Sequence, residues 1–176
     1  MDKLREQTLS STKIYNGRVF KITHDEVELS TGQKSSRDVV HHNGGVVIVA
    51  EKDNKIIMVQ QYRYATKEVL YELPAGKLDK KGEDILSAAK RELEEETGYQ
   101  ANNWEPLGYI WTSPGFCNEK LYLFKANNLT FKGQHLDEGE ILNFYEIEKE
   151  KVFKMIKNFE INDSKTICAL MRAYKL

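Results

Sequence analysis

Residues 76–99 read Gly-Lys-Leu-Asp-Lys-Lys-Gly-Glu-Asp-Ile-Leu-Ser-Ala-Ala-Lys-Arg-Glu-Leu-Glu-Glu-Glu-Thr-Gly-Tyr and carry the pattern that decides the fold. Apolar side chains recur within this stretch at helical spacing, at Ile85, Leu86, Ala89 and Leu93. Residues at this spacing share one side of a helix and define a buried stripe. The stretch therefore predicts a short amphipathic helix preceded by a glycine-containing loop.

Three glutamates, Glu92, Glu95 and Glu96, lie three and four residues apart, so their side chains share a face of that helix. Like charges at this spacing cost an isolated helix roughly 0.2–0.5 kcal/mol per pair, and partial burial raises the cost. Hard divalent cations, which prefer oxygen ligands, would reverse the sign of that energy. The alternative from helix statistics is a solvated acidic face, with Arg91 and Glu95 paired across one turn.

The order of charged and glycine residues resembles the signature of the Nudix hydrolase family, which is a glycine, a glutamate and then Arg-Glu-aliphatic-x-Glu-Glu-x-Gly-aliphatic. The matching residues are Gly76, Glu83, Arg91-Glu92-Leu93, Glu95-Glu96 and Gly98-Tyr99. Seven residues separate Glu83 from Arg91, as the family requires, but six rather than five separate Gly76 from Glu83. The extra residue falls in a turn-like stretch, residues 79–82, where an insertion is tolerated. The departure therefore concerns the loop and not the register of the helix.

Length and composition point to a globular chain. Its 176 residues suffice for one domain with a small attachment. The formal charge of −1, from 26 basic and 27 acidic side chains, argues against a nucleic-acid binder held by bulk electrostatics. No apolar run is long enough to span a bilayer, and the first residues lack the apolar core of a secretion signal, so we expect a cytoplasmic protein without a membrane partner. Cys117 and Cys168 are expected to remain reduced thiols.

The N-terminal part of the chain is rich in strand-forming residues and predicts a small antiparallel sheet. Strands are expected at residues 13–15, 19–23 and 25–29, with turns at Asn16-Gly17 and Thr31-Gly32. Three short strands bury little, so such a sheet has to lean on the rest of the chain or on a second subunit. The family resemblance favours a second subunit. We expect residues 1–42 to form an extension in dimer contact and residues 43–176 to form the Nudix domain.

The rest of the chain alternates strand and helix patterns. Strands are predicted at 46–50, 55–63, 69–73, 104–111, 120–126 and 142–147, with loops at 112–119 and 132–140. Two further helices are predicted, one over residues 149–158 and one ending at Tyr174 that starts after Asp163 or Ser164 as its cap. The sum is an α/β (α+β) fold with a mixed sheet and helices on both sides. The resemblance implies a Nudix-type α/β/α sandwich preceded by the small N-terminal antiparallel β-sheet.

The resemblance also implies a chemistry, the hydrolysis of a nucleoside diphosphate linked to another moiety with magnesium, or manganese as a substitute. Glu92, Glu95 and Glu96 match the metal-binding glutamates of the family, and the backbone carbonyl of Ala75 matches a further ligand. Such metals neutralise developing charge and lower the pKa of bound water.

Two other residues of the motif have supporting roles by the same resemblance. Arg91 is expected to orient the neighbouring glutamates, and Glu83 to cap or brace the helix.

Residues outside the motif resemble the ADP-ribose pyrophosphatase subfamily. Pro114 lies sixteen residues after Gly98, where that subfamily has a marker proline. Loop prolines are common, so this feature gains weight from four further stretches. They are Arg37-Asp-Val-Val-His-His, Gln61-Tyr-Arg63, Glu72-Leu-Pro-Ala-Gly and Asp163-Ser-Lys-Thr. The resemblance thus covers nearly the whole chain and implies cleavage of ADP-ribose, or a similar ADP-sugar, to AMP and a sugar phosphate such as ribose 5-phosphate.

Candidate substrate contacts follow from this subfamily resemblance. Arg37 and Arg63 align with arginines that contact substrate, and a guanidinium suits phosphate because it presents paired donors in one plane. The alternative for each is an ordinary surface arginine. Arg18 falls where the subfamily's N-terminal sheet reaches the adenine bound by the partner subunit. Glu119, in the loop that Pro114 shapes, is a candidate for metal or ribose contact.

A hydrolase that attacks phosphorus with water gains from a general base, which the family often places in a late mobile loop. Here Glu138 is the first choice and Glu140 the second, and a solvated acidic turn is the alternative for at least one of them. Gly139 between them would let the loop open and close.

The function predicted from sequence is thus a magnesium-dependent ADP-sugar pyrophosphatase that works as a homodimer. Two alternatives remain open. One is a Nudix pyrophosphatase acting on another nucleotide sugar or on an oxidised nucleoside triphosphate. The other is a non-catalytic module that binds a nucleotide or a partner protein, which the unusual spacing before Glu83 motivates.

Overall fold

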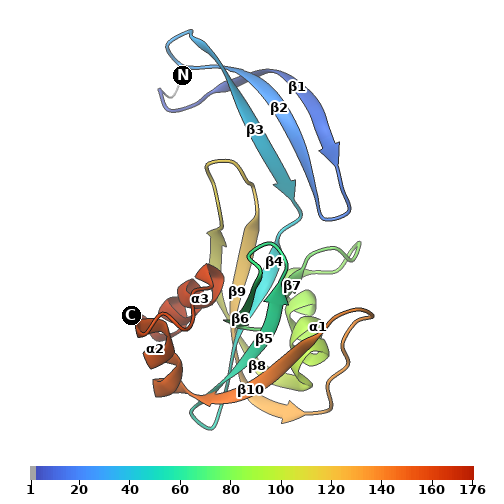
Figure 1. Cartoon of the computed structure of the whole chain (residues 1–176), viewed down its shortest axis with the longest axis vertical. Helices are drawn as coiled ribbons and strands as arrows, with labels where there is room; N and C mark the ends of the chain where they lie inside the picture. The colour runs from blue at the N-terminus through green and yellow to red at the C-terminus, as the bar shows by residue number, and fades with distance from the viewer. Residues whose placement is uncertain (1–2) are drawn as a thin grey trace. The chain divides into compact units, whose positions relative to one another are not determined.

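Two units make up the part of the chain that the structure, a computed structural model, describes, which is residues 3–176 (Figure 1). The first unit comprises residues 3–44 together with Trp111–Lys120. The second comprises Gly45–Ile110 and Leu121–Leu176. We refer to the first as the N-terminal unit and to the second, which holds the glutamates expected from the sequence to bind metal, as the catalytic unit.

The N-terminal unit contains an antiparallel sheet in the order β1-β2-β3. Its strands are β1 (Gln7–Asn16), β2 (Phe20–Glu28) and β3 (Lys34–His42). Gly32, at a φ of 81°, provides the left-handed conformation that the turn between β2 and β3 requires. The small antiparallel sheet that the sequence predicts is therefore confirmed.

The predicted strand boundaries in this sheet were wrong: β1 starts at Gln7 rather than at residue 13, and the strand β3 at Lys34–His42 was not predicted. Residues 19–23 and 25–29 were expected as two strands, but β2 runs without a break through His24 and Asp25. Both polar side chains have cross-strand partners, since His24 Nδ1 lies 2.7 Å from Asp38 and Ser11 donates to Asp25 at 2.5 Å. A sheet with solvent-accessible faces accommodates such residues within a strand.

The loop between β8 and β9 also belongs to the N-terminal unit. The Val40 N–H donates to the Phe116 carbonyl at 2.7 Å, and the Asn118 N–H donates back to the Val40 carbonyl at 3.0 Å. The loop thereby extends the pairing of β3 by a short parallel bridge between Val40 and Cys117.

The catalytic unit is built on a mixed sheet in the order β10-β5-β4-β9-β8, with β6 beside β5 and β7 beside β4. The β4–β9 pair is parallel, whereas β4–β5 and β5–β10 are antiparallel. The strands are β4 (Gly45–Lys52), β5 (Lys55–Arg63), β6 (Glu68–Glu72), β7 (Ala75–Lys77), β8 (Tyr99–Trp111), β9 (Lys120–Phe131) and β10 (Leu142–Glu148).

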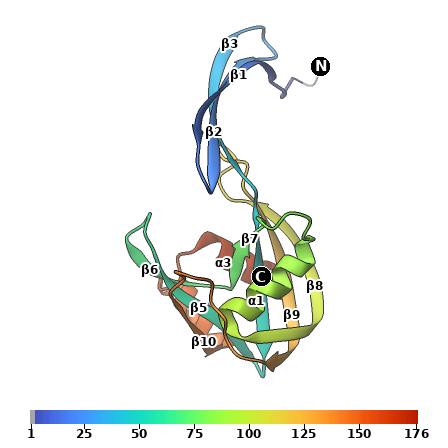
Figure 2. The same cartoon turned by 90° about the vertical axis from the view of Figure 1, so that its right-hand side faces the viewer.

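Helices cover both faces of this sheet, as Figures 1 and 2 show. Helix α1 (Ile85–Thr97) lies on one face, and α2 (Lys149–Lys157) and α3 (Ser164–Tyr174) lie on the other. The buried strand β4 supplies both layers of the core. Val46 and Ile48 pack in the cluster that includes α1, and Val47 packs in the cluster that includes α2 and α3. A strand buried on both faces is expected to be continuously apolar, which is the pattern seen in the sequence.

The predicted sandwich and its order of elements are confirmed, and the differences are local. Strands β8 and β9 are longer than predicted, and the short strand β7 was not predicted. The cap of α3 is Asp163, whose side chain accepts from the Thr166 N–H. Within residues 3–176, no helix is long and apolar enough to cross a membrane.

Candidate active site

Helix α1 is fixed at both ends by residues of its own stretch. The Asp84 side chain accepts hydrogen bonds from the N–H groups of Leu86 and Ser87 at 3.0 and 3.1 Å, so Asp84 is the cap and not Glu83. At the other end, Gly98 adopts a φ of 73°, and a Cβ there would lie 2.6 Å from the backbone of Gly133. The left-handed conformation of Gly98 therefore ends the helix shortly after Glu95 and Glu96.

Arg91 gathers three carboxylates around one guanidinium. Its Nε lies 2.9 Å from Glu83, and its Nη1 lies 2.8 Å from Glu92 and 2.7 Å from Glu95. Glu83 thus braces the helix through Arg91, which is one of the two roles predicted for it. Arg91 orients the glutamates, as expected from sequence.

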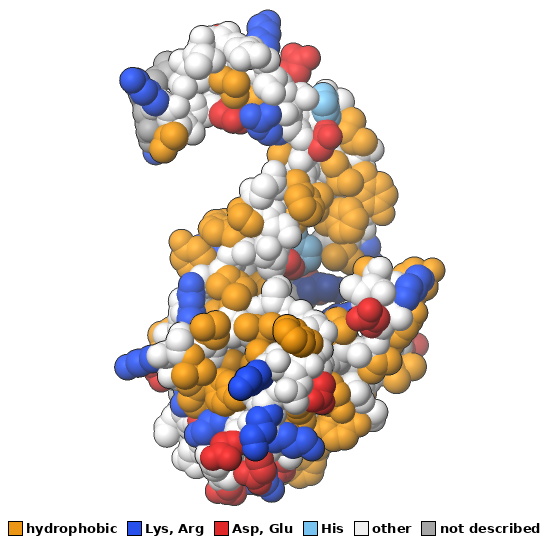
Figure 3. Space-filling model, turned by 60° about the vertical axis from the view of Figure 1, so that its left-hand side comes forward, with side chains coloured by type: hydrophobic (Ala, Val, Ile, Leu, Met, Phe, Trp, Pro, Cys, Tyr) orange, Lys and Arg blue, Asp and Glu red, His pale blue; other side chains and the backbone are white. Residues whose placement is uncertain are grey.

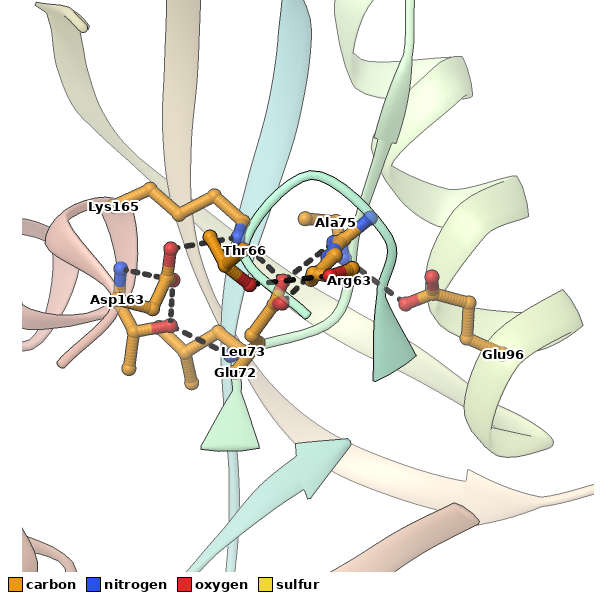
Figure 4. A network of polar contacts seen from close by, with 9 residues as sticks. Arg63, Thr66, Glu72, Leu73, Ala75, Glu96, Asp163 and Lys165 are labelled. Carbon is orange, nitrogen blue, oxygen red and sulfur yellow. Dashed lines mark hydrogen bonds and ion pairs between the residues drawn. The ribbon is translucent and has the colours of Figure 1, made fainter. Parts of the chain in front are cut away.

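Glu96 is the most deeply buried carboxylate of α1, with 2% of its surface exposed. Its Oε2 accepts a hydrogen bond of 3.0 Å from the Ala75 N–H (Figure 4). Burial raises its pKa well above the usual value, and the negative charges of Glu140 and Glu92 add to this effect, whereas the Ala75 bond opposes it. A cation beside Glu96 would favour its ionised form.

Glu92 occupies space that a glycine provides. A Cβ at Gly76 would lie 1.8 Å from the Glu92 carboxyl carbon, so no larger residue fits there without moving that carboxylate. Burial raises the pKa of Glu92, and the nearby charge of Arg91 opposes the rise. The motif glycine therefore has a steric role, which is to let β7 approach the carboxylates of α1 closely.

The donor chemistry of this cluster fits a hard divalent cation. Glu92 and Glu96 offer carboxylate oxygens, burial disfavours the ionised form of both side chains, and Gly76 leaves the room that Glu92 occupies. Throughout the described residues, 3–176, however, no group of three or more His, Cys, Asp or Glu side chains is arranged so that it could hold a metal ion. Glu92 and Glu95 point to Arg91 instead, so a bound cation would have to share or replace these contacts.

A second buried carboxylate, Glu72, lies at the end of β6 and is 1% exposed. Arg63 donates to both of its oxygens, at 2.6 and 2.5 Å, and Lys165 lies at 2.5 Å (Figure 4). Burial would raise the pKa of Glu72, but the bonds from Arg63 and the charge of Lys165 outweigh burial and lower it. No role for Glu72 was predicted from the sequence. The signal available was a charged residue within the otherwise apolar strand pattern of residues 69–73.

The two candidate bases of the late loop differ in their surroundings. Glu140 is half-buried, and its charge acts on both Glu92 and Glu96. Glu138 is exposed. Gly139 between them adopts a φ of 83°. The structure thus brings Glu140 into the electrostatic neighbourhood of the helix carboxylates.

The other predicted site residues belong to the N-terminal unit. Arg37 on β3 lies 2.5 Å from Glu6 and donates to Ser35, so its guanidinium is already paired there. Arg18 is exposed in the bend between β1 and β2, and Pro114 is exposed in the β8–β9 loop. In the same loop Glu119 lies 3.3 Å from His42 Nδ1. The residues brought together in the catalytic unit are Ala75, Glu92, Glu95, Glu96 and Glu140, with Arg63 nearby.

Similarity to known proteins agrees with this fold. Residues 40–170 match the NUDIX domain family, and the chain belongs to this family as a Nudix hydrolase. A Bacillus methanolicus protein named methanol dehydrogenase activator is 44% identical over 97% of this chain and 94% of its own length. The ADP-ribose pyrophosphatase of Bacillus subtilis is 39% identical over 97% of this chain and 93% of its own. That of Mycobacterium tuberculosis is 40% identical over 77% of this chain and 67% of its own.

A solved structure confirms the fold. The crystal structure of an ADP compounds hydrolase superposes with a TM-score of 0.87 at 23% identity, over 97% of this chain and 93% of that one. At this identity the likeness concerns the fold alone.

Proposed function

We propose that this Nudix hydrolase cleaves the pyrophosphate of ADP-ribose, or of a similar ADP-sugar, to AMP and a sugar phosphate such as ribose 5-phosphate. The observation that carries the proposal is a pair of neighbouring carboxylates, the half-buried Glu92 and the buried Glu96, whose ionised forms a cation would stabilise. The substrate class is supported by the two ADP-ribose pyrophosphatases that are 39% and 40% identical to this chain.

Magnesium, with manganese as a substitute, is the proposed cofactor. Glu92, Glu95, Glu96 and the carbonyl of Ala75 would hold it, and when bound it would screen the diphosphate and acidify water. The protein's own part is to keep these oxygens together against their repulsion. Burial by β7 and the hydrogen bond from the Ala75 N–H do this for Glu96, and Arg91 does it for Glu92 and Glu95.

Arginines are proposed to contact the substrate phosphates. Glu72 binds Nε and Nη2 of Arg63, so the guanidinium is held in one orientation and its Nη1 remains for an anion. Arg37, Arg18, Pro114 and Glu119 are kept as proposed substrate contacts from the N-terminal unit. Of these, Arg37 would have to exchange its contact with Glu6 for one with substrate.

Glu140 is our proposed general base, ahead of Glu138, because its charge acts on the helix carboxylates and it is less exposed. The carboxylate would take a proton from water as the water oxygen bonds to one phosphorus. The bond from that phosphorus to the bridging oxygen breaks, and the bridging oxygen leaves with the other phosphate. A drop of roughly 100-fold in kcat is expected for Glu140→Gln and little change for Glu138→Gln. The opposite result would assign the base to Glu138.

A homodimer is proposed, with the sheet of residues 1–42 at the contact. Large apolar side chains are exposed on this sheet, including Leu9, Ile14, Tyr15 and Phe20. Figure 3 shows hydrophobic side chains at the surface of this unit on the face drawn, and interspersed charges of both signs on the catalytic unit. We propose a cytoplasmic location, with neither nucleic acid nor membrane as a partner, on the grounds of composition given above.

The test is a panel of nucleotide substrates assayed with purified protein and magnesium. We expect ADP-ribose or another ADP-sugar to give the highest kcat/KM, with AMP as a product. A preference for a nucleoside triphosphate or for a GDP-sugar would overturn the substrate assignment and leave the Nudix chemistry in place. Binding of ADP-ribose without turnover of any substrate would favour the non-catalytic alternative.

A second candidate function is activation of a dehydrogenase. It is favoured by the 44% identity, over nearly the whole chain, to the methanol dehydrogenase activator of Bacillus methanolicus. The measurement is the rate of purified methanol dehydrogenase with and without this protein. A higher rate that requires Glu96 would support this function and tie it to the same site, whereas an unchanged rate would exclude it for that enzyme.

A further inference from the structure

The first turn of α3 is bonded to the strand connection that faces α1. Thr166 is fully buried, and its hydroxyl accepts a hydrogen bond of 2.8 Å from the Leu73 N–H. The same hydroxyl donates to the Asp163 carboxylate at 2.6 Å, and the Thr166 N–H donates to that carboxylate at 3.0 Å. The single O–H donor and one acceptor position of this hydroxyl are therefore used, and the direction of its O–H bond is fixed by Asp163.

The segment held in this way, residues 72–75, touches two functional groups. One residue before Leu73, Glu72 binds Arg63 on one side and Lys165 on the other (Figure 4). Two residues after it, the Ala75 N–H donates to Glu96 at 3.0 Å. The start of α3 thus contacts, through one short stretch of backbone, both the proposed phosphate-binding arginine and the deepest carboxylate.

The stretch between these contacts is stiff. Pro74 has a fixed φ and no N–H, and its carbonyl accepts from the Ile48 N–H of the central strand at 2.9 Å. Leu73 is fully buried, so it has no free space to shift into. A displacement imposed at the Leu73 N–H is therefore passed on to Ala75 rather than absorbed between them.

We propose that Asp163, Lys165 and Thr166 are positioning residues for catalysis. Through Leu73 and Ala75 they set the position of Glu96, and through Glu72 they set the orientation of Arg63. This inference rests on the proposed function. Docking of α3 does not need these polar contacts, because Ala169 and Leu170 already bury its apolar side in the core.

Removal of the hydroxyl tests the first arm. In Thr166→Val the Leu73 N–H loses its acceptor inside the protein, so residues 73–75 have to move to find another. Misplacement of a catalytic group by about 1 Å costs roughly 100-fold in rate, so we expect kcat for ADP-ribose to fall about 10- to 100-fold with KM nearly constant. Thr166→Ser keeps the hydroxyl and is expected to restore kcat.

A readout independent of turnover is the backbone amide resonance of Ala75 in ¹⁵N NMR spectra of the protein without added metal. Because this amide donates to Glu96, its proton shift reports on that bond. We expect it to move in Thr166→Val and to stay in Thr166→Ser. The matched control is Tyr174→Phe, which removes another α3 side-chain bond, from the Tyr174 hydroxyl to Glu51 at 2.8 Å. This control is expected to lower the melting temperature without changing kcat or the Ala75 resonance.

Lys165 tests the second arm, and does so even where Thr166→Val fails to fold. Lys165→Met leaves Glu72 to Arg63 alone, so the guanidinium is drawn toward the carboxylate and away from phosphate. We expect KM for ADP-ribose to rise about tenfold, which corresponds to 1.4 kcal/mol, with recovery in Lys165→Arg. An unchanged KM would overturn this arm.

The outcomes separate the two proposals. A lower melting temperature in Thr166→Val, with kcat and the Ala75 resonance unchanged, would reduce Thr166 to a purely structural role and overturn the inference. If the wild-type protein does not hydrolyse ADP-ribose, the proposed substrate fails. The Ala75 resonance then still decides whether Thr166 positions the contact with Glu96.

Discussion

The two units of this molecule are stabilised in different ways. The catalytic unit has a hydrophobic cluster on each face of its sheet, and consecutive residues of β4 are fully buried. Among residues 3–44, by contrast, the only buried hydrophobic side chain is Val27, and every residue of β1 is exposed. The N-terminal sheet is therefore held by strand pairing and surface contacts.

This difference suggests that catalysis and assembly of the proposed enzyme depend on different units. Carboxylates can be kept close together only where packing fixes them, and the glutamates of α1 lie against such a core. A three-stranded sheet without a core of its own gains stability from a partner surface. The comparison predicts that changes in the catalytic unit affect rate and folding, and that changes in the N-terminal unit affect assembly.

The largest effect is expected from Glu96→Gln in the catalytic unit. Loss of this carboxylate removes several kcal/mol of cation-dependent charge stabilisation, so kcat/KM should fall roughly 1000-fold. The amide can still accept from the Ala75 N–H, so the melting temperature should not fall. Because burial raises the pKa of Glu96, the wild-type protein binds an extra proton when folded, and its stability declines as pH rises from the usual value of 4.5 through the folded pKa. The variant should lack this decline.

The matched control is Glu94→Gln on the same helix. The Glu94 side chain accepts a hydrogen bond of 2.9 Å from the exposed side chain of Gln100. Its activity and melting temperature should equal those of the wild type. Full activity in Glu96→Gln would remove Glu96 from the site and with it the chemistry proposed for α1.

A truncation in the core tests the packing side of the comparison. Leu93 of α1 is fully buried, so Leu93→Ala should lower the free energy of unfolding by about 2–5 kcal/mol. Ile14→Ala, on the exposed face of β1, should lower it by less than about 0.5 kcal/mol. Urea titrations followed by circular dichroism measure both. Equal losses in the two variants would show that the N-terminal sheet has a buried core of its own.

Dimer formation should depend more on the exposed Ile14 than on the buried Leu93. Ile14 is 63% exposed, so Ile14→Asp leaves the folded chain intact but places a charge in the proposed dimer contact. We expect analytical ultracentrifugation to show a dimer for the wild type and a monomer for Ile14→Asp, with Leu93→Ala still dimeric where it is folded. A wild-type monomer at all concentrations would refute the proposed contact.

The sequence predicts the catalytic unit well because its signals are local. The helix period of residues 85–93 and the apolar run of β4 each follow from a few neighbouring residues. The motif also specifies which glutamates gather on α1. Gly76 was predicted only as a motif residue, because its role depends on how closely β7 approaches Glu92 in space.

What the sequence could not show are contacts between distant segments. Thr166 and Leu73 are 93 residues apart, and neither has a local pattern that pairs them. Glu72 and Lys165, which also pair, are separated by the same number of residues in the sequence. The continuity of β2 through His24 and Asp25 likewise depends on partners in the neighbouring strands. Such contacts become visible only when the topology is known.

The smallest effect is expected from an exposed pair in the N-terminal sheet. The hydrogen bond that protonated His24 donates to Asp38 raises the pKa of His24, so the stability that this bond contributes is complete below the usual value of 6.5 and is lost as pH rises through the folded pKa. Asp38→Asn should return the pKa of His24, measured by NMR titration, toward 6.5. Because both side chains are exposed, the melting temperature should change little, and only below the folded pKa of His24. Added salt should cancel this change. A large fall in melting temperature that salt does not cancel would mean that this sheet depends on its polar pairs for folding. The two units would then differ in the kind of interaction that stabilises them, and not in how strongly they are stabilised.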